Sequence, residues 1–131
     1  MHANDALGRE FLLLWEQRDT DKLVAACTAD AVWHHRPLPP AVGSDGIREF
    51  AQRFADVPGG PYEILLQVAD DRVVMNERLD RVTFGGQLAE LRACGVFEIE
   101  DGTVQVGLRL TLVISAVSVG DGFSVLPTIT R

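Results

Sequence analysis

Four β-forming segments joined by very short turns fill the second half of the chain, and they constrain its fold more than any other feature. The turn signals are Asp70-Asp71, Gly85-Gly86 and Asp101-Gly102, and residue pairs of this kind are typical of β-hairpins. Links this short join antiparallel neighbours. We therefore predict four consecutive antiparallel strands, over 62–70, 72–84, 87–100 and 103–119.

The first third of the chain predicts helices. Apolar residues recur at helical spacing from Leu7 to Trp15, and "RDTD" at 18–21 is typical of a helix end followed by a new N-cap. A third helix is expected over 43–57 with Ser44 as its N-cap, after a short strand "AVWHH" and an extended proline-rich link "RPLPP". This order predicts an α+β fold with helices first and a curved antiparallel meander after them.

The composition indicates one globular domain over residues 1–131. Hydrophobic residues make up 47% of the chain and charged residues 24%, which is too apolar for a disordered chain. The formal net charge of −7 argues against a nucleic-acid partner. No segment approaches the length of about 20 apolar residues that a membrane helix needs.

The N-terminal segment and the cysteines predict a cytoplasmic protein without a metal site. The apolar run "FLLLW" is interrupted by Glu16 and has no basic leader before it, so we expect no signal peptide. Cys27 and Cys94 lack the spacing of metal ligands, so we expect two free, buried thiols and no metal site.

The strand over 73–84 carries an ion pair in the middle of an apolar face. Side chains alternate across a strand, so Asn76, Arg78, Asp80 and Val82 share one face. A buried ion pair is often no more stabilising than hydrophobic residues would be. Either this face is exposed to solvent, or it lines a pocket in which Arg78 orients Asp80 as a general acid.

The turn at Gly85-Gly86 fixes what lies opposite these residues. A two-residue turn places Ala93 opposite Arg78 and Leu91 opposite Asp80. The two apolar residues then belong to the same wall as the ion pair.

Three segments carry a resemblance to a known family. They are "HRPLPPAVGSDGIREF", "NERLDRV" and "LRACGVFEIEDGTV", and in this order they resemble the limonene-1,2-epoxide hydrolase family. The resemblance runs from about Phe11 to Val106. It implies the cone-shaped fold of nuclear transport factor 2 and ketosteroid isomerase, with a bent mixed sheet around an apolar pocket.

The resemblance also implies roles for site residues. Arg78 and Asp80 match the family motif "ERxD", in which the aspartate protonates the epoxide oxygen and the arginine links the carboxylates. The family's water-holding Tyr and Asn are replaced here by Trp33 and His35. His35 either holds a water or is a partly exposed histidine at a strand end, and Trp33 lines the pocket without replacing the phenol, because indole only donates.

The family's second aspartate, its water-activating base, is absent. Counting from "GVF" places Gly107, Leu108 and Arg109 at that point of the strand, and no carboxylate occurs between Asp101 and Asp121. Two registers remain open. A two-residue turn at 101–102 directs the apolar even-numbered residues into the pocket, whereas a bulged three-residue loop directs Arg109 there.

Residues 107–131 depart from the family. They contain few charges and many β-forming residues, and they predict one long strand, a "GDG" turn and a short last strand. The departure is either natural or the result of a changed reading frame. The apolar run "LVISAV" at 112–117 indicates a dimer interface or an aggregation-prone edge.

These observations together predict an epoxide hydrolase-like protein for a small lipophilic, terpene- or polyketide-like molecule, impaired by the missing base. One alternative is a cyclase or isomerase in which the substrate's own hydroxyl opens the epoxide. The other is a non-catalytic protein that binds hydrophobic ligands. We expect a homodimer, no metal or organic cofactor, and no nucleic-acid or membrane partner. The expected catalytic residues are Asp80, Arg78 and His35, and the expected pocket residues are Trp33, Asn76, Val82, Leu91, Ala93 and Arg109.

Overall fold

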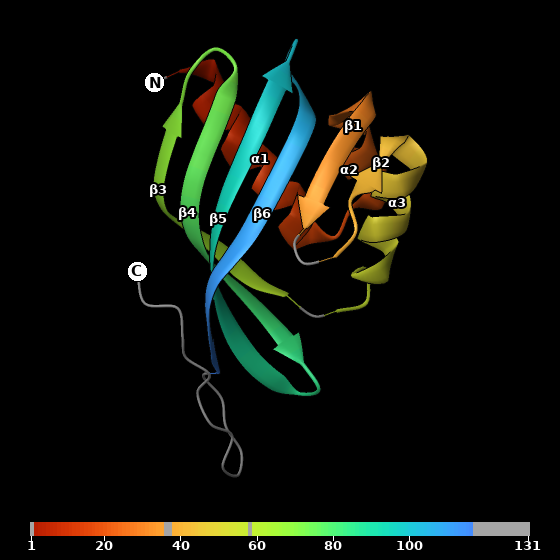
Figure 1. Cartoon of the computed structure of the whole chain (residues 1–131). Helices are drawn as coiled ribbons and strands as arrows, with labels where there is room; N and C mark the ends of the chain where they lie inside the picture. The colour runs from red at the N-terminus through yellow and green to blue at the C-terminus, as the bar shows by residue number, and fades with distance from the viewer. Residues whose placement is uncertain (1, 36–37, 58, 117–131) are drawn as a thin grey trace.

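The computed structural model describes residues 2–35, 38–57 and 59–116. Three helices and six strands follow one another in these residues, and the helices precede the four long strands (Figure 1). The bounds are α1 Ala3–Gln17, α2 Thr20–Ala25, β1 Cys27–His35, β2 Ala41–Val42, α3 Gly43–Arg53, β3 Gly59–Ala69, β4 Val73–Phe84, β5 Gln87–Glu100 and β6 Thr103–Ala116.

The strands form one curved, mixed sheet in the order β2-β1-β6-β5-β4-β3. β1 runs parallel to β6, and every other neighbouring pair is antiparallel. In Figure 1 the long strands bend and twist, and α1 lies behind the sheet as seen in this view. The predicted α+β fold, with helices packed on a strongly bent sheet, is confirmed.

The two glycine-containing hairpin turns form where the sequence predicts them. Gly85 and Gly86 both have positive φ, and so do Asp101 and Gly102, as two-residue hairpin turns of this type require. The register between β4 and β5 follows from the first turn, with Arg78 paired to Ala93 and Asp80 to Leu91.

A bulge in β6 settles which of its side chains face the helices. Ile99 pairs with Val104, but Glu98 pairs with Val106, so Gln105 is an extra residue. The turn therefore has two residues, as in the first predicted register, and yet Arg109 faces inward, as in the second. Neither alternative had allowed for a bulge three residues beyond the turn.

A second bulge changes the face of β3. Leu66 pairs with Glu77 and Ile64 with Arg78, which leaves Leu65 as the extra residue. Without it, alternation from the Asp70-Asp71 turn would direct Tyr62 to the outer face of the sheet. With the bulge, Tyr62 pairs with Asp80 on the inner face.

The helix boundaries confirm one prediction and correct another. Arg18 ends α1 in the left-handed conformation, and Asp19 caps α2 by accepting a hydrogen bond from the backbone N–H of Lys22. The prediction that Ser44 is an N-cap is wrong. Strand β2 leads directly into α3 through Gly43, whose φ is +72°, so Ser44 already lies inside the first turn of the helix.

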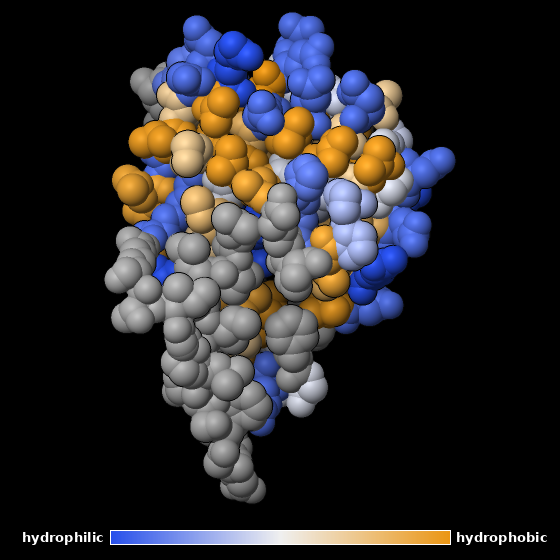
Figure 2. Space-filling view, viewed as in Figure 1, coloured by the Kyte–Doolittle hydropathy of each residue, from blue (hydrophilic) through white to orange (hydrophobic). Residues whose placement is uncertain are grey.

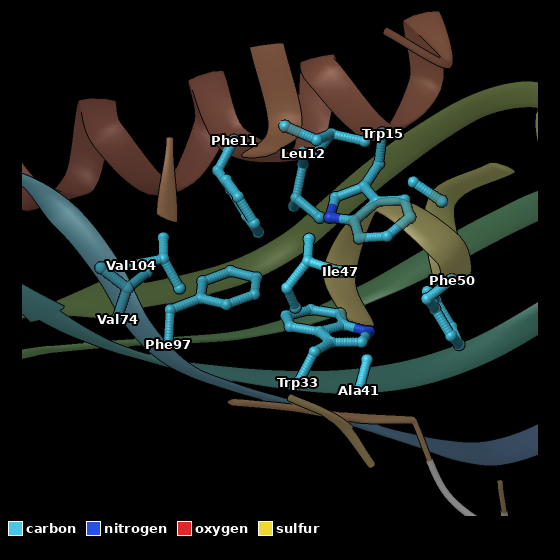
Figure 3. Close-up of a cluster of buried hydrophobic side chains, with 12 residues drawn as sticks. Phe11, Leu12, Trp15, Trp33, Ala41, Ile47, Phe50, Val74, Phe97 and Val104 are labelled. Carbon is cyan, nitrogen blue, oxygen red and sulfur yellow. The ribbon is translucent and has the colours of Figure 1, made fainter. Parts of the chain in front are cut away.

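The hydrophobic core fills the space between the helices and the inner face of the sheet (Figure 3). Aromatic rings from α1 meet rings from β1 and β5 there, with Phe11 lying edge-on to Phe97. The buried members are Phe11, Leu12, Trp15, Leu23, Trp33, Ala41, Ile47, Phe50, Ala51, Val74, Phe97 and Val104.

Three sequence-based predictions fall partly outside the described residues. They concern the "RPLPP" link, the "GDG" turn and the short last strand, and the apolar run at 112–117, whose side chains are likewise outside the description. Within the described part of the chain, no helix combines the length and apolar character needed to cross a bilayer.

Candidate active site

A cavity of about 210 Å³ lies among the helices and the inner face of the sheet. Ligand pockets are commonly about 300–1,000 Å³, so this cavity suits a small molecule. Most of its wall is aliphatic or aromatic. The lining residues are Leu12, Trp15, Arg18, Trp33, His35, Leu38, Phe50, Phe54, Val57, Tyr62, Arg78, Asp80, Val82, Leu91 and Arg109.

A buried cluster of charges forms the polar part of this wall. Arg78 Nε donates to Asp80 Oδ1 at 2.8 Å, and the side chains of both residues are 2% exposed. Arg109 Nε and Nη2 both lie 2.9 Å from Asp80 Oδ2. Asp80 thus accepts charge-assisted hydrogen bonds on both of its oxygens, one from each arginine.

Gly95 makes room for the guanidinium of Arg78. It lies on β5 opposite Asn76, and a Cβ at this position would collide with Arg78 Nη1 and lie 2.9 Å from Oδ1 of Asn76. Asn76 Oδ1 accepts from Arg78 Nη1 at 2.8 Å, and Asn76 Nδ2 in turn donates to the side chain of Gln67. The missing side chain of Gly95 and the amide of Asn76 therefore fix the position of Arg78.

His35 extends the cluster beyond Arg109. Its Nε2 lies 3.0 Å from Arg109 Nη1, and because a guanidinium only donates, Nε2 is the acceptor. Burial lowers the pKa of His35 to about 4, and the positive charges of Arg109 and Arg78 add to this effect. The imidazole is therefore neutral at pH 7, with its proton on Nδ1, a buried atom that has no hydrogen-bond partner in the described structure.

Trp33 forms an aromatic wall beside the charges. A Cβ at Gly107 would collide with its indole ring, so this glycine lets the ring lie directly on β6. The indole stacks on Phe97 with ring centroids 5.9 Å apart and on Trp15 at 5.5 Å. Its Nε1 is buried without a partner in the described structure, so Trp33 supplies shape and apolar surface.

The cavity brings together most, but not all, of the residues expected at it. Trp33, His35, Arg78, Asp80, Val82, Leu91 and Arg109 line it. Asn76 and Ala93, which we had expected in the lining, do not belong to it. Asn76 lies behind the guanidinium of Arg78 and holds it. Ala93 is fully buried opposite Arg78 in the sheet, where the larger side chain covers it.

Arg18 and Tyr62 also line the cavity, and neither was predicted from the sequence. Arg18 Nη1 donates to the hydroxyl of Tyr62 at 3.1 Å and to the carbonyl of Trp15 at 2.8 Å. Arg18 Nε donates to the carbonyl of Val57. A weak signal existed, because Tyr62 is the single tyrosine of the chain, but its face depends on the bulge at Leu65.

No group of three or more His, Cys, Asp or Glu side chains that could hold a metal ion occurs among the described residues. The two cysteines are free thiols, each half-buried. Burial raises the pKa of Cys27 to about 11, so this thiol is protonated and unreactive at neutral pH. The chemistry that the described site offers is that of guanidinium, carboxylate, imidazole and phenol groups.

Comparison with known proteins places this fold and cavity in a family. The sequence pattern of the SnoaL-like domain matches residues 9–106. The chain belongs to the SnoaL-like domain family. The matched region begins within α1 and ends in the first residues of β6, before Arg109, which lines the cavity. No curated protein sequence matches the chain significantly.

Solved structures share the fold of this SnoaL-like domain. An LEH-like epoxide hydrolase from M. tuberculosis is 25% identical, with a TM-score of 0.70 over 79% of this chain and 78% of that one. SalBIII, an epoxide hydrolase/cyclase-like enzyme of pyran ring formation in the polyether salinomycin, is 15% identical, with a TM-score of 0.72 over 82% and 88%. A putative polyketide cyclase from Xanthomonas campestris is 18% identical, with a TM-score of 0.69 over 80% and 87%.

Proposed function

We propose that this SnoaL-like protein opens the epoxide ring of a small lipophilic molecule bound in the cavity. The observation that carries the proposal is the buried Arg78–Asp80–Arg109 cluster in the wall of an otherwise apolar cavity. Desolvating three charges costs several kcal/mol per ion, and hydrophobic residues would stabilise the fold as well or better. A charge cluster at such a place is expected where chemistry requires it.

Ring opening requires two catalytic functions from the site. A nucleophile must lose its proton, and the epoxide oxygen must be stabilised as its bond to carbon breaks. Asp80 is the one carboxylate among the described lining residues, and it already accepts from two guanidinium groups. We therefore assign to Asp80 the acceptance of the nucleophile's proton, and to the positive charge of Arg109 the stabilisation of the developing alkoxide.

This assignment differs from the roles that the family resemblance implies for the strand aspartate. There the strand aspartate donates a proton to the epoxide. In this structure both oxygens of Asp80 accept hydrogen bonds from arginines. In the proposed step the attacking O–H forms the new C–O bond, its proton passes to Asp80, the epoxide C–O bond breaks, and the proton returns from Asp80 to the alkoxide.

The test is the conversion of limonene 1,2-oxide to its diol, measured by mass spectrometry with ¹⁸O-labelled water. Asp80→Asn and Arg109→Gln should each reduce turnover by about 10²-fold or more. The first removes the proton acceptor, and the second removes the charge that stabilises the alkoxide. The matched control is Arg81→Gln, because Arg81 lies on the same strand but pairs with Glu63 and Glu90 on the outer face. Turnover that is unchanged in Asp80→Asn would exclude the proposed site.

A second candidate is ring closure, in which the substrate's own hydroxyl opens the epoxide. It is favoured by one observation: within residues 107–109, where the family resemblance implies the water-activating aspartate, an arginine, Arg109, faces Asp80. A hydroxyl already held beside the epoxide reacts intramolecularly and depends less on a strong base. A terpene hydroxy-epoxide that yields a cyclic ether faster than limonene 1,2-oxide yields diol would select this candidate over hydrolysis.

A further inference from the structure

The cavity carries an excess of positive charge that epoxide opening does not explain. Among its described lining residues are three arginines, Arg18, Arg78 and Arg109, and one carboxylate, Asp80. His35 adds no negative charge and is neutral at pH 7, since its pKa is about 4. The chain as a whole has a formal net charge of −7. An acidic protein thus lines its cavity with cations.

Arg18 accounts for the part of this excess that lies away from the Asp80 cluster. Its guanidinium donates to the carbonyls of Trp15 and Val57 and to the hydroxyl of Tyr62. None of these groups carries a negative charge. Among the described residues no carboxylate lies within ion-pair distance of Arg18, whereas Arg78 and Arg109 both pair with Asp80.

The hydrogen bonds of Arg18 use three of its five N–H donors. Nε and both hydrogens of Nη1 have acceptors, which leaves the two hydrogens of Nη2. The hydroxyl of Tyr62 accepts from Nη1, so its own hydrogen remains available to donate. Arg18 and Tyr62 therefore present neighbouring donors beside the same cavity, one of them on a fixed cation.

Tyr62 connects these donors to the candidate catalytic group. It pairs directly with Asp80 across β3 and β4, and directly opposed residues in antiparallel strands have Cβ atoms about 4.5–5.5 Å apart. Tyr62 and Asp80 also line the same cavity, so a ligand that reaches Arg18 and Tyr62 with one end shares this cavity with Asp80.

We propose that Arg18 and Tyr62 form a carboxylate-binding subsite, so that the ligand of the cavity is a small lipophilic acid. Its carboxylate accepts from Arg18 Nη2 and from the Tyr62 hydroxyl, and its hydrocarbon part lies against the aromatic wall of Trp15 and Trp33. The subsite names the substrate class of the proposed epoxide opening, as an epoxide of such an acid. It concerns binding and is therefore tested without turnover.

The test compares geranic acid with geraniol, which share one carbon skeleton and differ in the carboxylate. Both tryptophans of the chain line the cavity, so quenching of tryptophan fluorescence reports binding. At pH 7.5 the acid should bind roughly tenfold or more tightly than the alcohol, as a charge-assisted contact predicts. In Arg18→Gln this preference should disappear while the affinity for geraniol stays the same.

Three further variants make the test specific. Arg18→Lys should restore part of the preference for geranic acid, and Tyr62→Phe should reduce it, because each changes one donor. Arg81→Gln is the control and should keep the full preference. Unchanged geraniol binding in Arg18→Gln shows that loss of the Trp15 and Val57 contacts has not unfolded the cavity.

Two results would overturn the subsite. One is equal affinity of the parent for the acid and the alcohol. The other is a preference that survives Arg18→Gln but is lost in Arg109→Gln, which would place the carboxylate at the Asp80 cluster. If epoxides are not turned over but the preference for geranic acid depends on Arg18, the proposed function fails and the subsite stands.

Discussion

Arg109 contacts Asp80 through two nitrogens, Nε and Nη2, each 2.9 Å from the same carboxylate oxygen. The contact joins strands β6 and β4 across β5, and it exists because the bulge at Gln105 directs Arg109 inward. An acidic residue at position 109 would have given the site a second carboxylate. The arginine instead makes Asp80 the shared acceptor of two buried cations.

Removing the charge of Asp80 should reduce stability as well as activity. In Asp80→Asn the guanidinium groups of Arg78 and Arg109 would stay buried without their counter-charge, and breaking a buried pair in this way costs about 3–5 kcal/mol. Urea unfolding at pH 7 measures the change in the free energy of unfolding. The double variant Asp80→Asn with Arg109→Gln should recover part of the loss, since one unpaired cation is removed. If Asp80→Asn were as stable as the parent, Asp80 would not be the counter-charge that Arg78 and Arg109 share.

Placing a carboxylate at residue 109 should increase hydrolysis. Arg109→Asp loses the cation assigned to the alkoxide, but it supplies a base facing Asp80, so Asp80 can instead protonate the epoxide oxygen, as the family resemblance implies. General-base assistance contributes about 10²–10⁴-fold. Leu108→Asp is the matched control, because Leu108 pairs with Val96 and points to the outer face. Diol formation from limonene 1,2-oxide is the measurement. An equal gain in both variants would show that position in the sheet is irrelevant.

The stability of the protein should fall between pH 6.5 and pH 4 because of His35. Its pKa is lowered from 6.5 to about 4, chiefly by burial, so in this range the unfolded chain binds a proton that the folded chain does not. The free energy of unfolding therefore rises with pH across this window, and His35 causes no further rise above pH 6.5. After allowance for the partial exposure of the ring, the loss at pH 4 is roughly 2 kcal/mol.

Two variants isolate this effect of His35. Urea unfolding at pH 7, 6 and 5 should show a smaller decline for His35→Gln than for the parent, and an unchanged decline for His34→Gln. Asp5 and Asp70 do not affect this comparison. Hydrogen bonds hold their pKa values below the ordinary value of 3.8, so their contributions to the free energy of unfolding are lost only below pH 5. A parent whose stability is flat from pH 7 to pH 5 would contradict the burial of a neutral His35.

Filling the space at Gly95 should destabilise the protein through Arg78. In Gly95→Ala the new methyl group would collide with Arg78 Nη1, and overpacking of this kind costs about 1–3 kcal/mol. Cys94→Ala on the same strand is a control for a change on the other face of β5. Thermal unfolding measures both. If Gly95→Ala were neutral, Arg78 would have room to move, and its fixed position would not be a property of the site.

The outer face of the sheet predicts self-association. Leu66, Val68 and Met75 are 63%, 59% and 44% exposed on β3 and β4, and Figure 2 shows hydrophobic residues gathered over this part of the sheet. Contiguous exposed apolar surface is typical of interfaces. We expect a dimer in sedimentation at micromolar concentration, weakened by Leu66→Glu but not by Leu13→Glu, a change on the exposed side of α1. A monomeric parent would refute the dimer without affecting the fold.

Much of this arrangement could be predicted from sequence, because turns determine register over short distances. The glycine pair at 85–86 fixes the pairing of β4 with β5 over its whole length, and with it the shared wall of Arg78, Asp80 and Leu91. Periodicity likewise predicts α1 and its buried stripe. These inferences hold because each depends on residues close in the chain.

The remaining part of the site depends on bulges, which leave little trace in the sequence. Tyr62 faces inward only because Leu65 is an extra residue, and Arg109 only because Gln105 is one. Neither residue is a glycine or otherwise marks an irregularity. A bulge is a compromise between the twist of the sheet and the packing beneath it, so it follows from tertiary structure rather than from local pattern.

The bulge at Gln105 also means that the pairing of β6, as well as residue type, determines the chemistry of this cavity. If Gln105 entered the ladder opposite Glu98, the rest of β6 would rotate by one position. Leu108 would then face Asp80 in place of Arg109, and a charged wall would become an apolar one with no substitution at the site. Deleting Gln105, by contrast, would remove the bulge and keep Arg109 facing inward, so the loss of this one codon would leave the charge cluster in place.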